Sequence, residues 1–197
     1  MPAGSNMRYM YVGFHTSGDI RVKENENISE LSYAIYEDRI FLYFESELID
    51  TEINPEDIIS ENLIPFPNGD LWQRMSDIFH YSRPLGHEHW KRKLLNKKPR
   101  FRINYLKSEM ISSYIYYHFQ YQEEKTGDGD KYGMIFIMGD LIVMYTEEPI
   151  EAETLKYDGL LSSSNTPANW GELMEKHFKP WPDFKGNWRE MEKTVKV

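Results

Sequence analysis

The chain has 197 residues, 40% of them hydrophobic and 15% aromatic, with a formal net charge of −9. This apolar content excludes a wholly disordered chain. The acidic balance excludes a general binder of nucleic acid or anionic membranes, which needs clustered Lys and Arg. There is no cysteine, which excludes disulfides and Cys-ligated metals. Without a long apolar stretch or a signal-peptide pattern, we expect a cytoplasmic protein.

The first predicted element is a strand at Tyr9–Phe14, which is rich in aromatic and β-branched residues. A hairpin follows, with strands at 31–36 and 39–45 around the turn Glu37-Asp38. Both hairpin strands are apolar on both faces, as in a sheet buried between other layers. Asn54-Pro55 then predicts the start of a helix, because it combines a polar cap with Pro in the first turn.

A Pro-x-Pro segment (65–67) and a Trp-x-x-Met segment (72–75) precede a predicted strand at 77–81. The residues that follow predict a short helix at 87–95 and a strand at 101–106. A basic run extends from Lys91 to Arg102. We interpret it as a solvated helix end and linker, with an anion-binding patch as the alternative.

The remainder of the chain repeats this series of motifs in the same order. The corresponding segments are a predicted strand at 114–119, a hairpin at 131–137 and 141–147, a helix start at 165–167, Pro-x-Pro at 180–182, Trp-x-x-Met at 188–191 and a final strand at 193–197. The order is collinear, with offsets of roughly 100 residues, which indicates two diverged copies of one α+β unit. The alternative is a single irregular domain with recurrent aromatic strands.

Residues 131–197 resemble the C-terminal part of an L-rhamnose mutarotase-type domain. The resemblance rests on four features: the strand 141–147, Pro167-Ala-Asn-Trp170, Pro180-Trp-Pro182 and Trp188-x-x-Met191 before a final strand. It implies an α+β fold of two ferredoxin-like repeats, whose antiparallel sheets form a pseudo-symmetric dimeric α/β barrel within one chain. We assign repeat 1 to residues 7–82, a linker or inserted helix and strand to 83–109, and repeat 2 to 110–197. The expected assembly is a monomer with an internal pseudo-dimer, or a homodimer.

The resemblance also implies a monosaccharide mutarotase, an isomerase that opens and recloses a deoxyhexose ring without a cofactor. Such a reaction needs one group to remove the anomeric proton and another to protonate the ring oxygen, and histidine suits both near neutral pH. In the expected strand 114–121, His118 shares a face with Tyr116 and Gln120. We therefore assign catalysis to His118, His15 and Tyr116, with hydrogen-bonded sheet histidines as the alternative.

Aromatic rings pack on the apolar face of a sugar, and carboxylates bind its hydroxyls. The candidate substrate-binding residues are Trp72, Trp170, Trp188, Glu45, Glu147, Tyr145 and His80. Core tryptophans and solvated strand-end carboxylates are the alternative interpretation. His87 and His89 lack further metal ligands, so we predict neither a metal nor a cofactor.

A second function remains open on the same scaffold. It is a non-catalytic module that binds a small molecule or another protein. This alternative predicts an aromatic pocket, or an exposed apolar patch, without a paired acid and base. Where the partner is a small molecule, we expect it to be sugar-like.

Overall fold

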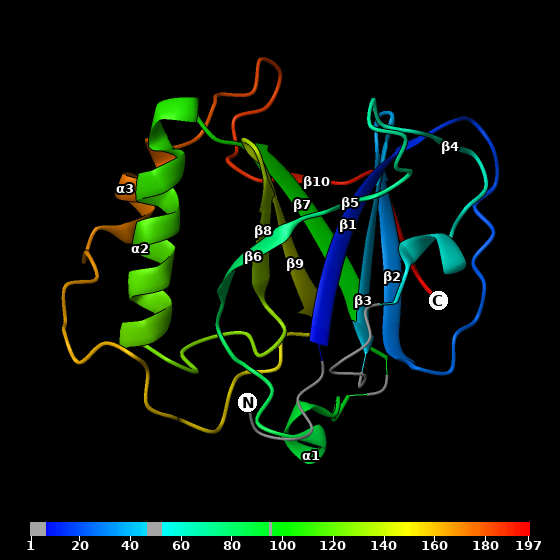
Figure 1. Ribbon diagram of the computed structural model, residues 1–197. Helices are drawn as coiled ribbons and strands as arrows, with labels where there is room; N and C mark the ends of the chain where they lie inside the picture. The colour runs from blue at the N-terminus through cyan, green and yellow to red at the C-terminus, as the bar shows by residue number, and fades with distance from the viewer. Residues whose placement is uncertain (1–6, 47–52, 95) are drawn as a thin grey trace. The chain divides into compact units, whose positions relative to one another are not determined.

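The computed structural model describes residues 7–46, 53–94 and 96–197 (Figure 1). It is an α+β protein with two antiparallel sheets and few helices. The chain divides into two compact units. Unit 1 contains Met1–Met75, Pro84–Pro99 and Met191–Val197, whereas unit 2 contains Ser76–Arg83 and Arg100–Glu190. No helix in the described ranges is long and apolar enough to cross a bilayer.

Unit 1 is built on a six-stranded sheet. Its elements are β1 (Met7–His15), β2 (Ile28–Tyr36), β3 (Arg39–Ser46), the 3₁₀ turn η1 (Pro55–Asp57), β4 (Leu63–Ile64), β5 (Gln73–Arg74), α1 (His87–Trp90) and β11 (Lys193–Lys196). The strand order is β11-β2-β3-β1-β4, and β5 also pairs with β1. The predicted hairpin is confirmed as β2 and β3.

Both faces of the central strands of unit 1 are buried. Tyr11, Leu42 and Phe44 belong to one core cluster, together with Ile58 and Ile59 after η1. The predicted helix start at Asn54-Pro55 forms only one 3₁₀ turn, in which the Asn54 side chain accepts a hydrogen bond from the Glu56 amide. On the opposite face, fully buried residues alternate with these along the strands, as the two-residue period requires; they include Met10, Ala34, Phe41 and Tyr43.

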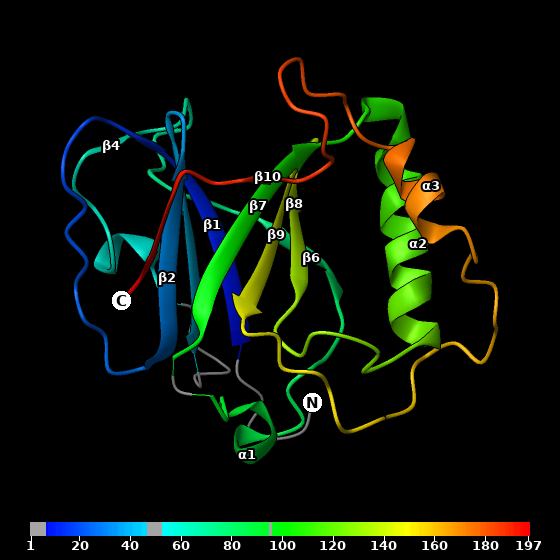
Figure 2. The same cartoon turned by 180° about the vertical axis from the view of Figure 1, so that it is seen from behind.

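Unit 2 is built on a five-stranded sheet. Its elements are β6 (Ser76–His80), β7 (Lys98–Tyr105), η2 (Ser108–Met110), α2 (Ile111–Glu124), β8 (Met134–Met138), β9 (Leu141–Glu148), α3 (Trp170–Glu175) and β10 (Arg189–Glu190). The strand order is β10-β7-β9-β8-β6. The predicted hairpin is confirmed as β8 and β9. Helices α2 and α3 lie side by side and cover one face of this sheet (Figures 1 and 2).

The strand orders of the two sheets correspond. In unit 1 the second hairpin strand, β3, pairs with β1, and the other edge of β1 pairs with β5, the two-residue strand of the first Trp-x-x-Met motif. In unit 2 the second hairpin strand, β9, pairs with β7, and the other edge of β7 pairs with β10, the two-residue strand of the second motif. The first hairpin strand of unit 1, β2, pairs with β11, which follows the second Trp-x-x-Met motif. The first hairpin strand of unit 2, β8, pairs with β6, which follows the first motif. The registers correspond beyond the irregularity between Asp77 and Phe79, since Val195 pairs with Tyr33 and Phe79 pairs with Ile135.

The prediction of a strand at Tyr114–Phe119 is wrong, because this segment lies inside the helix α2. The residues that face the core are Ile111, Tyr114, Ile115, His118 and Tyr121. They are three or four positions apart, which is the spacing of one helical face. This face packs on the sheet, and burying it outweighs the strand propensity of the aromatic residues. The strand of unit 2 that corresponds to β1 is therefore β7, and a strand at 101–106 was predicted.

Candidate functional site

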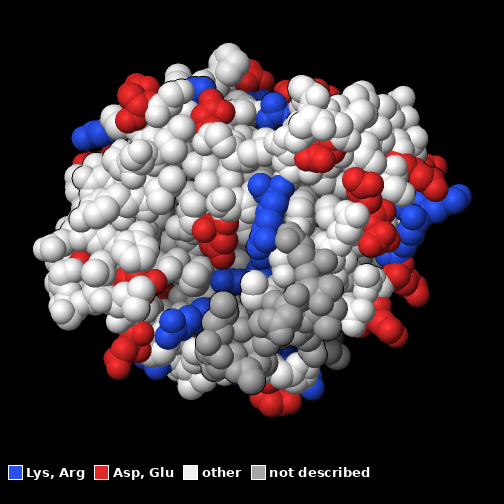
Figure 3. All heavy atoms as spheres, viewed as in Figure 1, with Lys and Arg blue, Asp and Glu red and all other residues white. Residues whose placement is uncertain are grey.

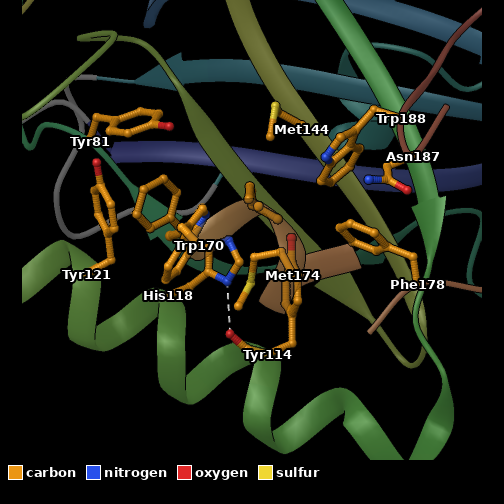
Figure 4. Close-up of a pocket in the computed structure, with 13 residues that line it drawn as sticks. Tyr81, Tyr114, His118, Tyr121, Met144, Trp170, Met174, Phe178, Asn187 and Trp188 are labelled. Atoms are coloured by element: carbon orange, nitrogen blue, oxygen red, sulfur yellow. Dashed lines mark hydrogen bonds between the residues drawn. The ribbon is translucent and has the colours of Figure 1, made fainter. Parts of the chain in front are cut away.

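The candidate site is a pocket in unit 2 between α2, α3 and one face of the sheet (Figure 4). It has a volume of about 250 Å³. The lining is mostly aromatic, with two methionines and one carboxamide; it consists of Phe79, Tyr81, Tyr114, His118, Tyr121, Ile135, Met144, Trp170, Gly171, Met174, Phe178, Asn187 and Trp188. A concave, mainly apolar pocket with a few polar groups is the usual form of a small-molecule site.

The helical period positions the side chains that enter the pocket from α2 and α3. Tyr114, His118 and Tyr121 are spaced four and three residues apart on α2, so they share one face. Trp170 and Met174 are four residues apart on one side of α3, and Met174 is buried. Figure 4 shows the α2 side chains projecting toward the strands, with Met144, Asn187 and Trp188 across the pocket from them.

A hydrogen bond to the backbone fixes the tautomer of His118. Its Nδ1 lies 2.9 Å from the carbonyl oxygen of Tyr114, and a carbonyl oxygen only accepts hydrogen bonds. Nδ1 therefore carries the proton, and Nε2 of the neutral ring presents a lone pair. Burial is the main cause that lowers the pKa of His118 from 6.5 to about 4, against the opposing effect of the Tyr114 hydrogen bond. The ring is thus neutral at physiological pH.

His177 has the same local geometry but a different environment. Its Nδ1 lies 2.9 Å from the carbonyl oxygen of Leu173, four residues earlier, and its Nε2 lies 2.9 Å from the Ser113 hydroxyl. By contrast, no residue in the described ranges hydrogen-bonds Nε2 of His118. His177 is not among the residues that line the pocket. The acceptor atom of His118 is therefore the one available to a ligand.

Aromatic rings surround the imidazole of His118. The ring of Tyr114 is tilted over it at a centroid distance of 4.0 Å. The ring centroids of Trp170 and Phe79 lie 5.0 and 5.1 Å from that of the imidazole, and both ring planes are steeply inclined to it, at 72° and 78°. Tyr121 contacts Trp170 in turn, at 5.0 Å. These contacts hold the histidine in one orientation and leave flat apolar surfaces on either side of its acceptor atom.

The pocket offers neutral polar groups only. Within the described ranges, no Asp, Glu, Lys or Arg lines it. Burial raises the pKa of Tyr114, Tyr81 and Tyr121 above the ordinary value for tyrosine. The phenols therefore remain protonated at physiological pH and are weak acids.

The structure brings three of the predicted site residues together, namely His118, Trp170 and Trp188. Tyr116 is 60% exposed, and the prediction that it shares a face with His118 is wrong. The reason is that two residues along a helix turn by about 200° rather than returning to the same side. Gln120 is likewise absent from the pocket lining, for the same reason.

Two further predicted residues lie in unit 1, outside this pocket. His15 is the last residue of β1, where its backbone amide donates to the Asp38 carbonyl. Trp72 is buried, and its indole N–H donates to the Ile59 carbonyl at 2.9 Å. Trp72 therefore has the core role that was the alternative interpretation of the tryptophans.

Glu45 is also in unit 1, where its carboxylate is fully buried. Both Nη atoms of Arg92 donate to it at 2.7 Å, Trp90 Nε1 donates at 2.8 Å and the Tyr43 hydroxyl at 2.5 Å. Burial by itself raises the pKa of Glu45, but these partners lower it below its ordinary value. The alternative interpretation as a solvated strand end is wrong for this residue, because its oxygens are saturated by partners from unit 1.

The corresponding strand of unit 2 repeats this pattern in part. The Tyr145 hydroxyl donates to Glu147 at 3.0 Å, and both residues are buried. His80, at the end of β6, has Nδ1 3.5 Å from the Asp77 carboxylate, and its amide donates to Gln122. None of Glu147, Tyr145 and His80 lines the aromatic pocket.

Several residues of the pocket were not predicted. Tyr114 and Tyr121 follow from the three-and-four spacing once α2 is recognised as a helix. Tyr81, Met144, Phe178 and Asn187 come from separate segments. No signal in the sequence places them beside His118, since only the tertiary fold brings them together.

The described residues contain no group of three or more His, Asp or Glu arranged to hold a metal ion. Acidic and basic side chains are interspersed on the face seen in Figure 3. Comparison with protein-family models, with curated proteins and with solved structures gives no match for this chain.

Proposed function

We propose that the aromatic pocket of unit 2 binds a small, flat ligand that donates a hydrogen bond to Nε2 of His118. The observation that carries this proposal is a buried, neutral histidine whose acceptor atom faces an aromatic pocket. No described residue hydrogen-bonds this acceptor, so a ligand that donates to it gains a hydrogen bond inside a mainly apolar pocket.

The shape and chemistry of the lining define the ligand class. Aromatic walls favour planar apolar groups, or the C–H face of a sugar ring. Because no charged side chain lines this pocket within the described ranges, the part of the ligand held here is uncharged. A hydroxyl or N–H group on a ring system meets these requirements.

The mutarotase function is a second proposal for the same pocket. Its support is that His118 provides a base atom in a pocket that also contains the indole rings of Trp170 and Trp188. General acid–base catalysis is most effective when the pKa values lie near the working pH. The pKa of His118 is below that range and that of Tyr114 is above it. Binding without catalysis therefore fits the electrostatics better.

We also infer that the two units are diverged ferredoxin-like repeats and that their sheets form a pseudo-symmetric barrel. The support is the shared strand order and register. A second line of support is that both faces of the central strands are buried, as in Phe41 and Phe44 of β3 and in Ile142 and Val143 of β9. This scaffold would leave the pocket on the helix-covered face of one repeat.

The experiment compares two probes that differ in one hydrogen-bond donor. Binding of 2-naphthol and of 2-methoxynaphthalene to the whole wild-type chain is measured by ligand-observed NMR and calorimetry. We expect 2-naphthol to bind about tenfold more tightly, which corresponds to one hydrogen bond to a buried acceptor. The variant His118→Phe, which keeps a ring but removes the acceptor, is expected to abolish the difference.

The matched control is His177→Phe, which changes a histidine of the same local geometry outside the pocket and is expected to preserve the difference. If neither probe binds, the binding function is wrong. The same samples test the isomerase proposal by magnetisation transfer between the anomers of L-rhamnose, L-fucose, D-glucose and D-galactose. Acceleration that is lost in His118→Phe supports catalysis, and no acceleration for any sugar contradicts it.

A further inference from the structure

A second cavity adjoins the aromatic pocket within unit 2. It has a volume of about 770 Å³ and is lined by polar residues of β7, β9 and the segments 127–130 and 150–156. Tyr81, Tyr121 and Met144 line both cavities. The two spaces are therefore neighbours along one face of the sheet, with an uncharged aromatic end and a charged end.

Arg102, on β7, is the charged group of this second cavity that lacks an ionic partner. Within residues 7–46, 53–94 and 96–197 its guanidinium makes a single hydrogen bond, from Nη2 to the Thr146 hydroxyl at 3.4 Å. Its Nε is buried and has no hydrogen-bond partner in those ranges. Among the described residues, no ion pair includes Arg102. A partly buried guanidinium in this state is an incomplete site, because charged groups away from water are normally paired.

The acidic residues that line the same cavity are engaged elsewhere. Glu148 pairs with Arg100, and Asp128 lies 3.9 Å from Lys156. Glu153 accepts hydrogen bonds from the Ser82 hydroxyl and from the Leu155 amide. Asp130 accepts one from the Tyr132 amide at 3.3 Å and has further partners. Arg102 is therefore a cation of this cavity that none of these carboxylates pairs with among the described residues.

The surroundings of Arg102 agree with this view. Burial, and then the neighbouring charge of Arg100, lower the pKa of Arg102, while Glu190 and Glu148 act in the opposite direction. An added anion would relieve both unfavourable effects. Guanidinium groups bind carboxylates through two parallel hydrogen bonds, which suits a planar acid.

We propose that Arg102 binds the carboxylate of an aromatic acid whose ring system occupies the adjacent aromatic pocket. This inference rests on the proposed binding function and adds the charge of the ligand to it. The ligand class is then an aromatic carboxylate, with its uncharged ring beside His118 and its anionic group on β7.

The test uses two pairs of probes, each pair consisting of an acid and its neutral amide: 2-naphthoate with 2-naphthamide, and 2-naphthylacetate with 2-naphthylacetamide. The second pair extends the acid by one methylene. In at least one pair the acid is expected to bind about tenfold more tightly than the amide, as for a charge-assisted hydrogen bond. This advantage should disappear in Arg102→Gln and persist in Lys156→Gln, which removes a cation from the same cavity.

The outcomes separate this inference from the proposed function. If amides and acids bind equally in both pairs, or if the acid keeps its advantage in Arg102→Gln, the role of Arg102 is wrong while the binding pocket stands. If no acid or amide binds while 2-naphthol does, this inference is overturned and the proposed function stands; if none of the probes binds, both are overturned. Far-ultraviolet circular dichroism of Arg102→Gln checks that the variant is folded.

Discussion

Nδ1 of His118 and the carbonyl oxygen of Tyr114 are 2.9 Å apart on consecutive turns of α2. This bond orients the imidazole and directs its free nitrogen into the pocket. The same contact in His177 leaves Nε2 beside Ser113 instead. The difference between these two histidines is the basis of the proposed function.

The first prediction concerns the pH dependence of stability. The pKa of His118 is about 4 in the folded protein and about 6.5 in an unfolded chain. Between these values the unfolded state binds more protons, so stability from this group is complete above pH 6.5 and is lost as the pH falls toward 4. The loss is on the order of 3 kcal/mol, because one pKa unit corresponds to about 1.4 kcal/mol. Denaturant unfolding of wild type and His118→Phe across this range measures it, and an equal pH slope in both contradicts the prediction.

The second prediction concerns Glu45 and Arg92. In Glu45→Gln the guanidinium of Arg92 loses its buried anionic partner, which is expected to reduce the free energy of unfolding by about 3 kcal/mol. The pKa of Glu45 is lowered in the fold, so in wild type this contribution is present above the unfolded value and fades as the pH falls below about 4.5. The control is Lys179→Met in the exposed Lys179–Asp140 pair, where a loss under about 1 kcal/mol is expected. Equal losses in the two variants would show that the buried pair has no special role.

The third prediction compares two glycines of unit 2. A Cβ at Gly159 would meet the backbone oxygen of Glu123 at 1.9 Å, whereas one at Gly171 would meet nothing within 4 Å. Gly159→Ala must displace the backbone, and we expect a loss of about 1–3 kcal/mol. Gly171→Ala lies inside α3 and is expected to stabilise by up to about 1 kcal/mol. Thermal unfolding of both variants tests this; a neutral Gly159→Ala would mean that the segment does not pack on α2 in this way.

The fourth prediction concerns Glu124, at the end of α2. Desolvation alone would raise its pKa, but hydrogen bonds from Ser163, Thr166 and Asn165 outweigh this effect and lower it to about 2. The attachment of the segment 163–166 is therefore retained until the pH falls below the ordinary range for carboxylates. In Glu124→Gln, amide exchange at Asn165 and Thr166 is expected to accelerate at neutral pH. Glu172→Gln, on α3, is the control, and unchanged exchange in Glu124→Gln would contradict the assignment.

The sequence predicted the strands well where two-residue patterns were bounded by turns. Both hairpins formed as expected because Glu37-Asp38 and Gly139-Asp140 interrupt apolar runs that must be buried. The strand after each Trp-x-x-Met motif also formed, as β6 and β11. That each of these pairs with the hairpin of the other series was not predicted, since strand partners distant in sequence are set by tertiary packing.

The helix α2 was missed because Tyr114-Ile-Tyr-Tyr-His-Phe119 has the composition of a strand. The spacing of Ile111, Tyr114 and His118 was the signal that would have identified it. His118 lines the pocket, although its expected partner, Tyr116, is exposed and does not share its helical face. The pocket residues from other segments come together only because α2 and α3 pack on the sheet. No motif or spacing in a single sequence predicts that packing.

The nitrogen NMR spectrum of the His118 imidazole, recorded during a titration with 2-naphthol at neutral pH, tests directly whether Nε2 accepts a hydrogen bond from a ligand. We expect a proton on Nδ1, none on Nε2, and a shift of the Nε2 signal as the probe binds, with the signals of His177 unchanged. A protonated Nε2 in the free protein, or an Nε2 signal that does not respond while the probe binds, would contradict the claim that this atom is the acceptor of the site.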